Sequence, residues 1–149
     1  MIKSEHGFTL VELLVTIAIT GALFSVIGGV IYQLTTTSEY GNDRLDATHE
    51  LQNAAQWLRT DGQQAVTATG GSSLVLTLPD ASVITYSLSG TSLLRTSGGT
   101  TMTLAQNISG ASFSVQGNLV TLVITASVPG RMSVSEQGTY QVYLRPVAP

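Results

Sequence analysis

Cysteine is absent from the 149 residues, which excludes disulfides, thiolate metal sites and a cysteine nucleophile. Charged residues make up only 10% of the chain, against roughly 25% in an ordinary soluble domain. The six lysines and arginines form no basic block, so nucleic acid is not predicted as a partner. No histidine follows His49, which excludes a serine–histidine–aspartate arrangement built after that point.

Carboxylates are also scarce in the second half, where only Asp80 and Glu136 follow Ala65. Calcium needs roughly six to eight oxygen ligands, usually with several carboxylates among them. The sequence therefore predicts no metal site and no cofactor, and we expect no enzymatic activity.

The chain does contain a long apolar run, residues 8–34, with no charged side chain between Leu13 and Tyr32. A helix of this length measures roughly 40 Å, enough to cross a hydrocarbon core of about 30 Å. A buried core helix is one alternative, but a domain this small has no room to surround it. A secretory signal peptide is another, but it has a shorter apolar stretch and a small-residue cleavage site behind it. We predict a single-pass membrane helix with a cytoplasmic N-terminus, because Lys3 precedes it.

Glu12 stands out within this run because no cation lies nearby in the sequence. A carboxylate in lipid costs on the order of 2.5–3.5 kcal/mol, so such a residue is a functional candidate by default. Its partner must come from the chain terminus or from another molecule. Simple solvation at the level of the lipid headgroups is the alternative.

The string Gly7-Phe8-Thr9-Leu10-Val11-Glu12, opening an apolar helix, resembles the N-terminal signature of type IV pilins and type II secretion pseudopilins. The resemblance implies that residues 1–7 are a leader, cut between Gly7 and Phe8 by a prepilin peptidase. It also implies that the new amine of Phe8 is methylated. Glu12 is then expected to attract the N-terminal amine of a neighbouring subunit during assembly.

Residues 35–66 predict an amphipathic continuation of the helix. An apolar stripe recurs at spacings of three and four, formed by Ala47, Leu51, Ala54, Ala55 and Leu58. Charged residues, Asp61 among them, are expected on the other faces. Gly62 is expected to end or kink the helix.

Residues 67–149 predict an antiparallel β head, because runs rich in threonine, serine and valine alternate with turn residues. The expected strands are Ser73–Leu78, Val83–Leu88, Leu93–Thr96, Thr101–Leu104, Ala111–Gln116, Leu119–Val128 and Thr139–Arg145. Together with the long helix they predict an α+β fold with one sheet packed on that helix, and the resemblance implies that this fold is pilin-like. Arg95, Arg131 and Arg145 are interpreted as residues of solubility and strand edges.

Two shorter patterns resemble J-type minor pseudopilins and W-type minor pilins. One is the hairpin pattern V-x-Y-x-L … L-x-R, with Tyr86 and Arg95 at its defining positions. The other is Leu58-Arg59-Thr60-Asp61, which is similar to the end of the long helix in the same group.

The resemblance implies a structural subunit, a minor pilin or pseudopilin of a type IV pilus-like or type II secretion filament. Its implied partners are prepilin peptidase, other pilin or pseudopilin subunits, the inner-membrane assembly platform and membrane lipid. We expect it in the bacterial inner membrane, with the head outside, and then in a periplasmic or surface filament. Two alternatives stay open: a major pilin or adhesin, and a membrane-tethered binding or enzymatic head that never polymerises.

Overall fold

The structure is a computed structural model that describes residues 9–129 and 133–146. The chain divides into two compact units, residues 1–39 and residues 40–149. It contains one long helix, α1 (Leu10–Gln64), followed by β1 (Thr67–Thr69), β2 (Ser73–Thr77), β3 (Val83–Ser89), β4 (Ser92–Ser97), β5 (Thr100–Ala105), β6 (Ile108–Gln116), β7 (Leu119–Val128) and β8 (Val134–Tyr143). The predicted α+β, pilin-like architecture is confirmed.

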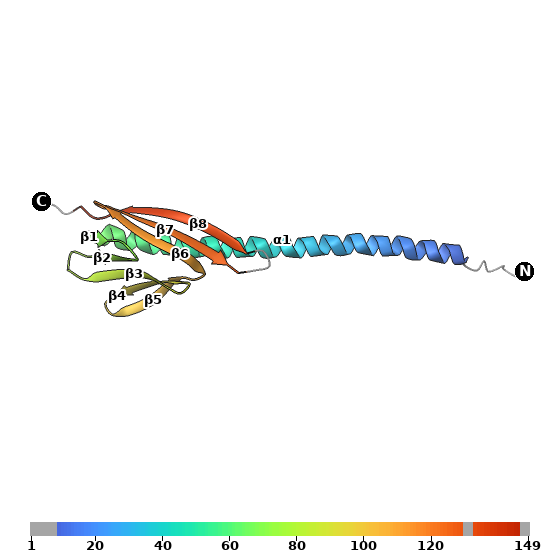
Figure 1. Cartoon of the computed structure of the whole chain (residues 1–149), viewed down its shortest axis with the longest axis horizontal. Helices are drawn as coiled ribbons and strands as arrows, with labels where there is room; N and C mark the ends of the chain where they lie inside the picture. The colour runs from blue at the N-terminus through green and yellow to red at the C-terminus, as the bar shows by residue number, and fades with distance from the viewer. Residues whose placement is uncertain (1–8, 130–132, 147–149) are drawn as a thin grey trace, which may run out of the picture. The chain divides into compact units, whose positions relative to one another are not determined.

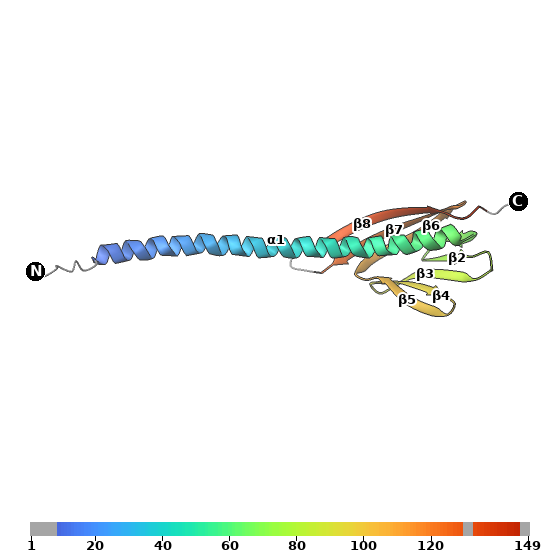
Figure 2. The same cartoon turned by 180° about the vertical axis from the view of Figure 1, so that it is seen from behind.

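The helix α1 contributes to both units, and its second half packs on the strands. Figures 1 and 2 give opposite views in which this half lies along one side of the strands. Its buried stripe contains Ala47, Leu51, Ala54 and Leu58, whereas Ala55 is only half-buried. The helix therefore presents a narrow face of alanines and leucines to the sheets, as the spacing of its apolar residues predicts.

The expectation that the helix ends at Gly62 was wrong, because α1 continues to Gln64. Gly62 is buried instead, at the place where α1 passes β8. A methyl group at this position would lie 2.6 Å from Cγ1 of Val142. Glycine here permits a close approach of helix and strand that any other residue would widen.

The strands form two sheets rather than the single sheet predicted. One sheet has the order β1-β2-β3-β4-β5 and the other the order β6-β7-β8, with all pairings antiparallel. The chain leaves the first sheet after β5 through Asn107, whose φ of 56° lies in the left-handed region. An isolated bridge between Gly71 and Phe113 joins the two sheets.

Three strand assignments from the sequence were incomplete. The short strand β1 was not predicted, β6 begins at Ile108 instead of Ala111, and β8 begins at Val134 instead of Thr139. In the central strand β7, five positions from Val120 to Val128 are buried in strict alternation. This alternation confirms the period-two pattern from which the strand was predicted.

The outer face of the five-stranded sheet carries no charge. The only charged residue in these five strands is Arg95, which lies on the inner side of β4 together with buried Leu93. The strand registers and the burial pattern place on the outer face Thr67, Thr69, Ser73, Val75, Thr77, Val83, Thr85, Ser87, Leu94, Thr96, Thr101 and Thr103. Hydroxyl groups and short aliphatic side chains thus cover this side of the head.

We expect Gly62→Ala to lower the free energy of unfolding by about 1–3 kcal/mol, because the added methyl group overpacks the contact with Val142. The matched control is Gly41→Ala on the same helix. A methyl group there meets nothing within 4 Å, so we expect a gain of about 0.5–1 kcal/mol. Urea unfolding in detergent micelles, followed by the fluorescence of Trp57, measures both. Equal effects at the two glycines would contradict the close approach.

Candidate functional site

The first turn of α1 is built by Thr9 and Glu12. The Glu12 N–H donates to Oγ1 of Thr9 at 3.2 Å, and the Leu13 N–H donates to the Thr9 carbonyl oxygen at 3.1 Å. Thr9 is therefore the N-cap, and Glu12 occupies the third helical position, as in a capping box. Negative charge is favourable at this end of a helix, so the first turn suits a carboxylate. The role of Thr9 was missed from the sequence, although the T-x-x-E spacing carries the signal.

Gly7 and Phe8, the residues of the predicted cleavage, lie outside the described residues. Only Phe8 stands between that cleavage point and the Thr9 cap in the sequence. Cleavage there would leave a mature N-terminus only one residue ahead of the helix cap.

Glu12 itself is exposed. Within residues 9–129 and 133–146 the ion pairs join Arg44 to Glu136 and Arg95 to Asp61, and neither involves Glu12. A cation for this carboxylate must therefore come from beyond the described part of the chain or from another molecule.

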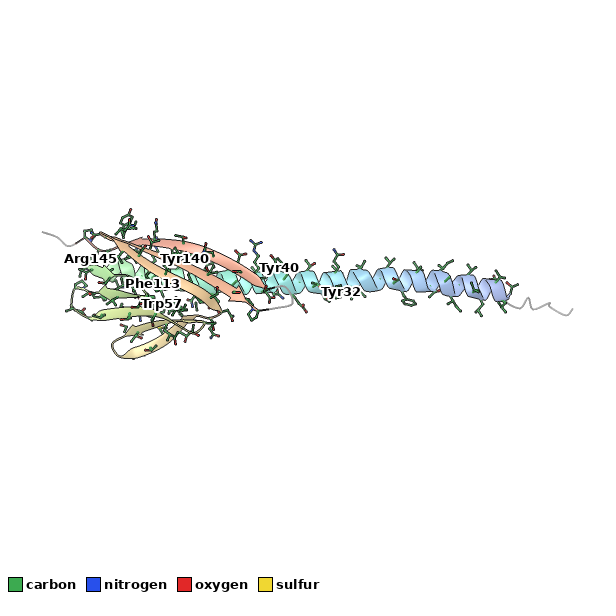
Figure 3. The ribbon with its side chains drawn as sticks, viewed as in Figure 1. Tyr32, Tyr40, Trp57, Phe113, Tyr140 and Arg145 are labelled. Carbon is green, nitrogen blue, oxygen red and sulfur yellow. The ribbon has the colours of Figure 1, made fainter. Side chains whose placement is uncertain are left out.

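Behind Glu12, α1 exposes apolar side chains around its whole circumference, as Figure 3 shows near Tyr32. Every residue from Leu10 to Leu34 is exposed, with Leu10 at 80% and Phe24 at 68%. The most apolar window of 18 residues in this helix has a mean hydropathy of 2.3. The helix is therefore long and apolar enough to cross a membrane.

Two threonine hydroxyls of this segment are satisfied within the helix. The hydroxyl of Thr16 donates to the Glu12 carbonyl oxygen, and that of Thr20 donates to the Thr16 carbonyl oxygen, both at 2.7 Å. Such bonds remove the cost of placing threonine in lipid. The segment therefore fits a membrane anchor.

A second polar arrangement lies inside the head, centred on the carboxylate of Asp61. Asp61 is 3% exposed and accepts two hydrogen bonds from Arg95, from Nε at 2.6 Å and from Nη2 at 3.0 Å. The fully buried hydroxyl of Tyr86 donates to the same carboxylate. The guanidinium carbon of Arg95 lies 4.9 Å from the ring centroid of Trp57. We call these four residues the Asp61 cluster.

The Asp61 cluster joins α1 to β3 and β4, because Asp61 and Trp57 lie on the helix and Tyr86 and Arg95 on the two strands. Burial, together with the hydrogen bond to Asp61 and its charge, raises the pKa of the Tyr86 phenol. The hydrogen bond to Asp61 also raises the pKa of Arg95. Every buried side-chain polar atom in the described residues has a partner. The arrangement is a hydrogen-bonded ion pair that holds the helix against the two strands.

The sequence interpretation of Asp61 and Arg95 was wrong. Asp61 was expected on a solvated face and Arg95 at a strand edge, but both point into the head. The signal was present: Asp61 follows Leu58 by three residues on the apolar stripe, and Arg95 follows buried Leu93 by two. Tyr86 and Arg95 are the two defining residues of the hairpin pattern noted in the sequence, and the structure gives them a common partner.

No group of three or more histidine, aspartate or glutamate side chains within the described residues is arranged to hold a metal ion.

Comparison with known proteins bears on the N-terminal segment. Residues 2–28 match the family described as the prokaryotic N-terminal methylation motif. No curated protein and no solved structure matches the chain. The motif supports a pilin-type or pseudopilin subunit processed by prepilin peptidase, and its family is structural rather than enzymatic.

We expect Arg95→Leu to lower the free energy of unfolding by about 3–5 kcal/mol, because it leaves the buried Asp61 carboxylate without its cation. The control is Arg145→Leu, at an exposed arginine of the same head, for which we expect a change within about 0.5 kcal/mol. Urea unfolding in micelles measures both. A loss at Arg95 no greater than at Arg145 would show that the ion pair is dispensable.

Stability should also fall at alkaline pH because of Tyr86. Its pKa is raised in the folded state, so above pH about 10 the unfolded state loses a proton that the folded state keeps. The contribution is fully present below that pH, and it falls by about 1.4 kcal/mol per pH unit above it. Tyr86→Phe should remove this slope, whereas Tyr143→Phe, at an exposed tyrosine, should retain it. Unfolding free energies measured between about pH 8 and pH 11.5, a range of ~3.5 units around the free tyrosine pKa, test whether stability falls as the pH rises.

Proposed function

We propose that this chain is a structural subunit of a type IV pilus-like or type II secretion filament, and that it acts as a minor pilin or pseudopilin. The carrying observation is Glu12: an exposed carboxylate in a capped first turn, without a described cation, opening an exposed apolar helix. The methylation motif over residues 2–28 supports the same proposal. In this role the subunit primes or caps the filament.

The proposed mechanism begins with insertion of residues 8–34 into the inner membrane, with residues 1–7 in the cytoplasm. Prepilin peptidase cuts between Gly7 and Phe8 and methylates the Phe8 amine. The assembly platform then moves the subunit from lipid into the filament, where the apolar helices pack together. Residues 35–66 continue the helix into the β head, residues 67–149, which lies outside the membrane and covers the filament.

In the filament, the Phe8 amine of one subunit pairs with Glu12 of the next. Either charge alone is costly in an apolar surrounding, and the pair removes most of that cost. Since the two groups must meet, the pair fixes the register between adjacent helices. Phe8 and Glu12 are thus assigned as assembly residues, and Phe8 as the methylation site.

Three glycines lie in the segment proposed for the filament core. Methyl groups at Gly21, Gly28 and Gly29 would meet nothing within 4 Å in the single chain. Close packing against neighbouring helices explains small residues here. Local melting of the helix inside the filament explains them equally well.

We expect Glu12→Gln to leave cleavage intact and to reduce incorporation into filaments by about two orders of magnitude. The neutral side chain leaves the buried amine of the neighbour unpaired, at a cost of about 3–5 kcal/mol. The control is Asp46→Asn, which removes an exposed carboxylate from the same helix outside the apolar segment. Immunoblots of sheared filaments and of membranes compare the variants. Normal incorporation of Glu12→Gln would contradict the proposed pairing of Glu12 with the Phe8 amine.

Gly7→Glu should leave the leader attached, because the peptidase site then carries a bulky charged residue. The mass of the membrane-bound protein distinguishes the two forms. Efficient removal of the leader from Gly7→Glu would overturn the assignment of residues 1–7.

Quantitative mass spectrometry of sheared filaments and inner membranes tests the function as a whole. A peptide that begins at methylated Phe8, at low stoichiometry beside another pilin, is the expected result. The same peptide as the dominant component would instead identify the major subunit. An intact Met1 terminus confined to membranes, in cells with an active prepilin peptidase, would leave a simple tethered protein and overturn the proposal.

A further inference from the structure

A groove of about 530 Å³ separates the last turns of α1 from β8. From the helix it is lined by Ala55, Gln56, Arg59 and Gln63, and from the strand by Tyr140, Gln141, Val142 and Tyr143. Figure 3 labels Tyr140 on this strand and Arg145 just beyond its end. All of these residues belong to the unit 40–149.

The strand side of the groove is an open sheet edge, because the order β6-β7-β8 leaves β8 paired on one side only. The direction of its main-chain groups follows from one hydrogen bond. The Leu144 N–H donates to the Asn118 carbonyl oxygen at 2.8 Å, toward β7. Since neighbouring residues of a strand alternate, the N–H and C=O groups of Tyr143 and Gln141 point away from β7.

The main-chain N–H of the next residue, Arg145, confirms this alternation. The N–H of Arg145 also points outward, and it donates to the Ala65 carbonyl oxygen at 2.9 Å, just after the end of α1. Earlier on the same edge, the outward main-chain N–H and C=O groups of Tyr143 and Gln141 have no main-chain partner outside their sheet within the described residues. The groove therefore offers two consecutive outward positions, about 7 Å apart, to an added strand.

The helix side of the groove supplies a positive charge. Arg44 and Arg95 are paired with Glu136 and Asp61, whereas Arg59 is exposed and has no ion pair in the described part of the chain. Among the residues that the structure describes, no acidic residue lines the groove. A carboxylate is the group that a free guanidinium at its wall recognises best, through paired hydrogen bonds.

We propose that this groove binds an extended acidic peptide segment of a partner protein, which adds to the edge of β8 and places a carboxylate on Arg59. Main-chain bonds to Gln141 and Tyr143 hold the added strand, and Arg59 selects its charge. This inference goes beyond the filament function and does not depend on leader cleavage.

A second copy of the chain is a poorer occupant than a different protein. Its other edge strands, β1, β5 and β6, contain no acidic residue, and Glu136 of β8 is already paired with Arg44. The described edge strands thus offer no free carboxylate to Arg59. The fit is to an acidic strand from another polypeptide.

The test uses the full chain in detergent micelles and a fluorescein-labelled probe, acetyl-Thr-Val-Asp-Val-Thr-amide, followed by fluorescence anisotropy. We expect saturable binding, weakened about tenfold when the aspartate of the probe is replaced by asparagine. Arg59→Gln should cause the same loss. Arg145→Gln, at an exposed arginine outside the groove lining, should change the affinity by less than about twofold.

The strand addition is tested separately by Gln141→Pro. Proline removes an outward N–H and the exposed side-chain bond from Gln141 to Thr121, but it spares the main-chain bonds to β7, so the sheet tolerates it at an edge. Thr139→Pro is the matched control, because its N–H also points outward but it lies outside the groove lining. We expect Gln141→Pro to abolish binding and Thr139→Pro to preserve it. A probe methylated on the aspartate nitrogen gives the same readout on the unchanged protein, should the proline variant unfold.

The inference would be overturned by no saturable binding of the probe, by equal binding of the methylated probe, or by equal binding by Arg59→Gln. Self-association that Gln141→Pro abolishes would assign the edge to a second copy instead, and would also overturn it. The uncleaved variant Gly7→Glu should bind the probe normally. Peptide binding can therefore be interpreted even if the chain fails to enter filaments. Filament incorporation can likewise be interpreted even if the peptide fails to bind.

Discussion

The exposed apolar surface of α1 between Leu10 and Leu34 is the constraint on which the rest depends. Each large side chain left in water costs about 1.5–3 kcal/mol relative to burial, and this segment buries none of its side chains within the chain. The segment must therefore be surrounded by lipid or by other helices. Because both surroundings satisfy the same requirement, a helix of this kind is able to pass from one to the other, provided that its single carboxylate, Glu12, is matched in each.

The second half of α1 packs against two sheets, partly through small side chains. Alanines and Gly62 bring the backbone close to the strands, and little apolar area is gained at each of these positions. The Asp61 cluster adds a directional contact to this shallow interface. Since a buried carboxylate without its cation is costly, the helix has one rotational setting in which Asp61 meets both Tyr86 and Arg95.

The sequence was sufficient for the parts of the fold that depend on periodicity. The continuous helix and the alternating strand β7 both follow from the spacing of apolar residues. The parts of the fold that depend on pairing between distant segments could not be predicted from periodicity. Asp61 and Arg95 are 34 residues apart, and each alone looks like a solvent-facing charge.

The division into two sheets was missed for a related reason. It rests on the left-handed residue Asn107 between β5 and β6, and a single asparagine in a turn does not indicate where the chain will go next. The groove beside β8 depends on that division, because it is the order of the second sheet that leaves this strand at an edge.

The outer face of the five-stranded sheet has a consequence for the environment in which the head works. Attractions between surface charges weaken as ionic strength rises and change sign or strength as groups titrate. A face made of hydroxyl and aliphatic groups contains nothing to screen and nothing to titrate in the ordinary range of pH. Contacts made through this face would therefore keep about the same strength at low and at high ionic strength and in acidified surroundings.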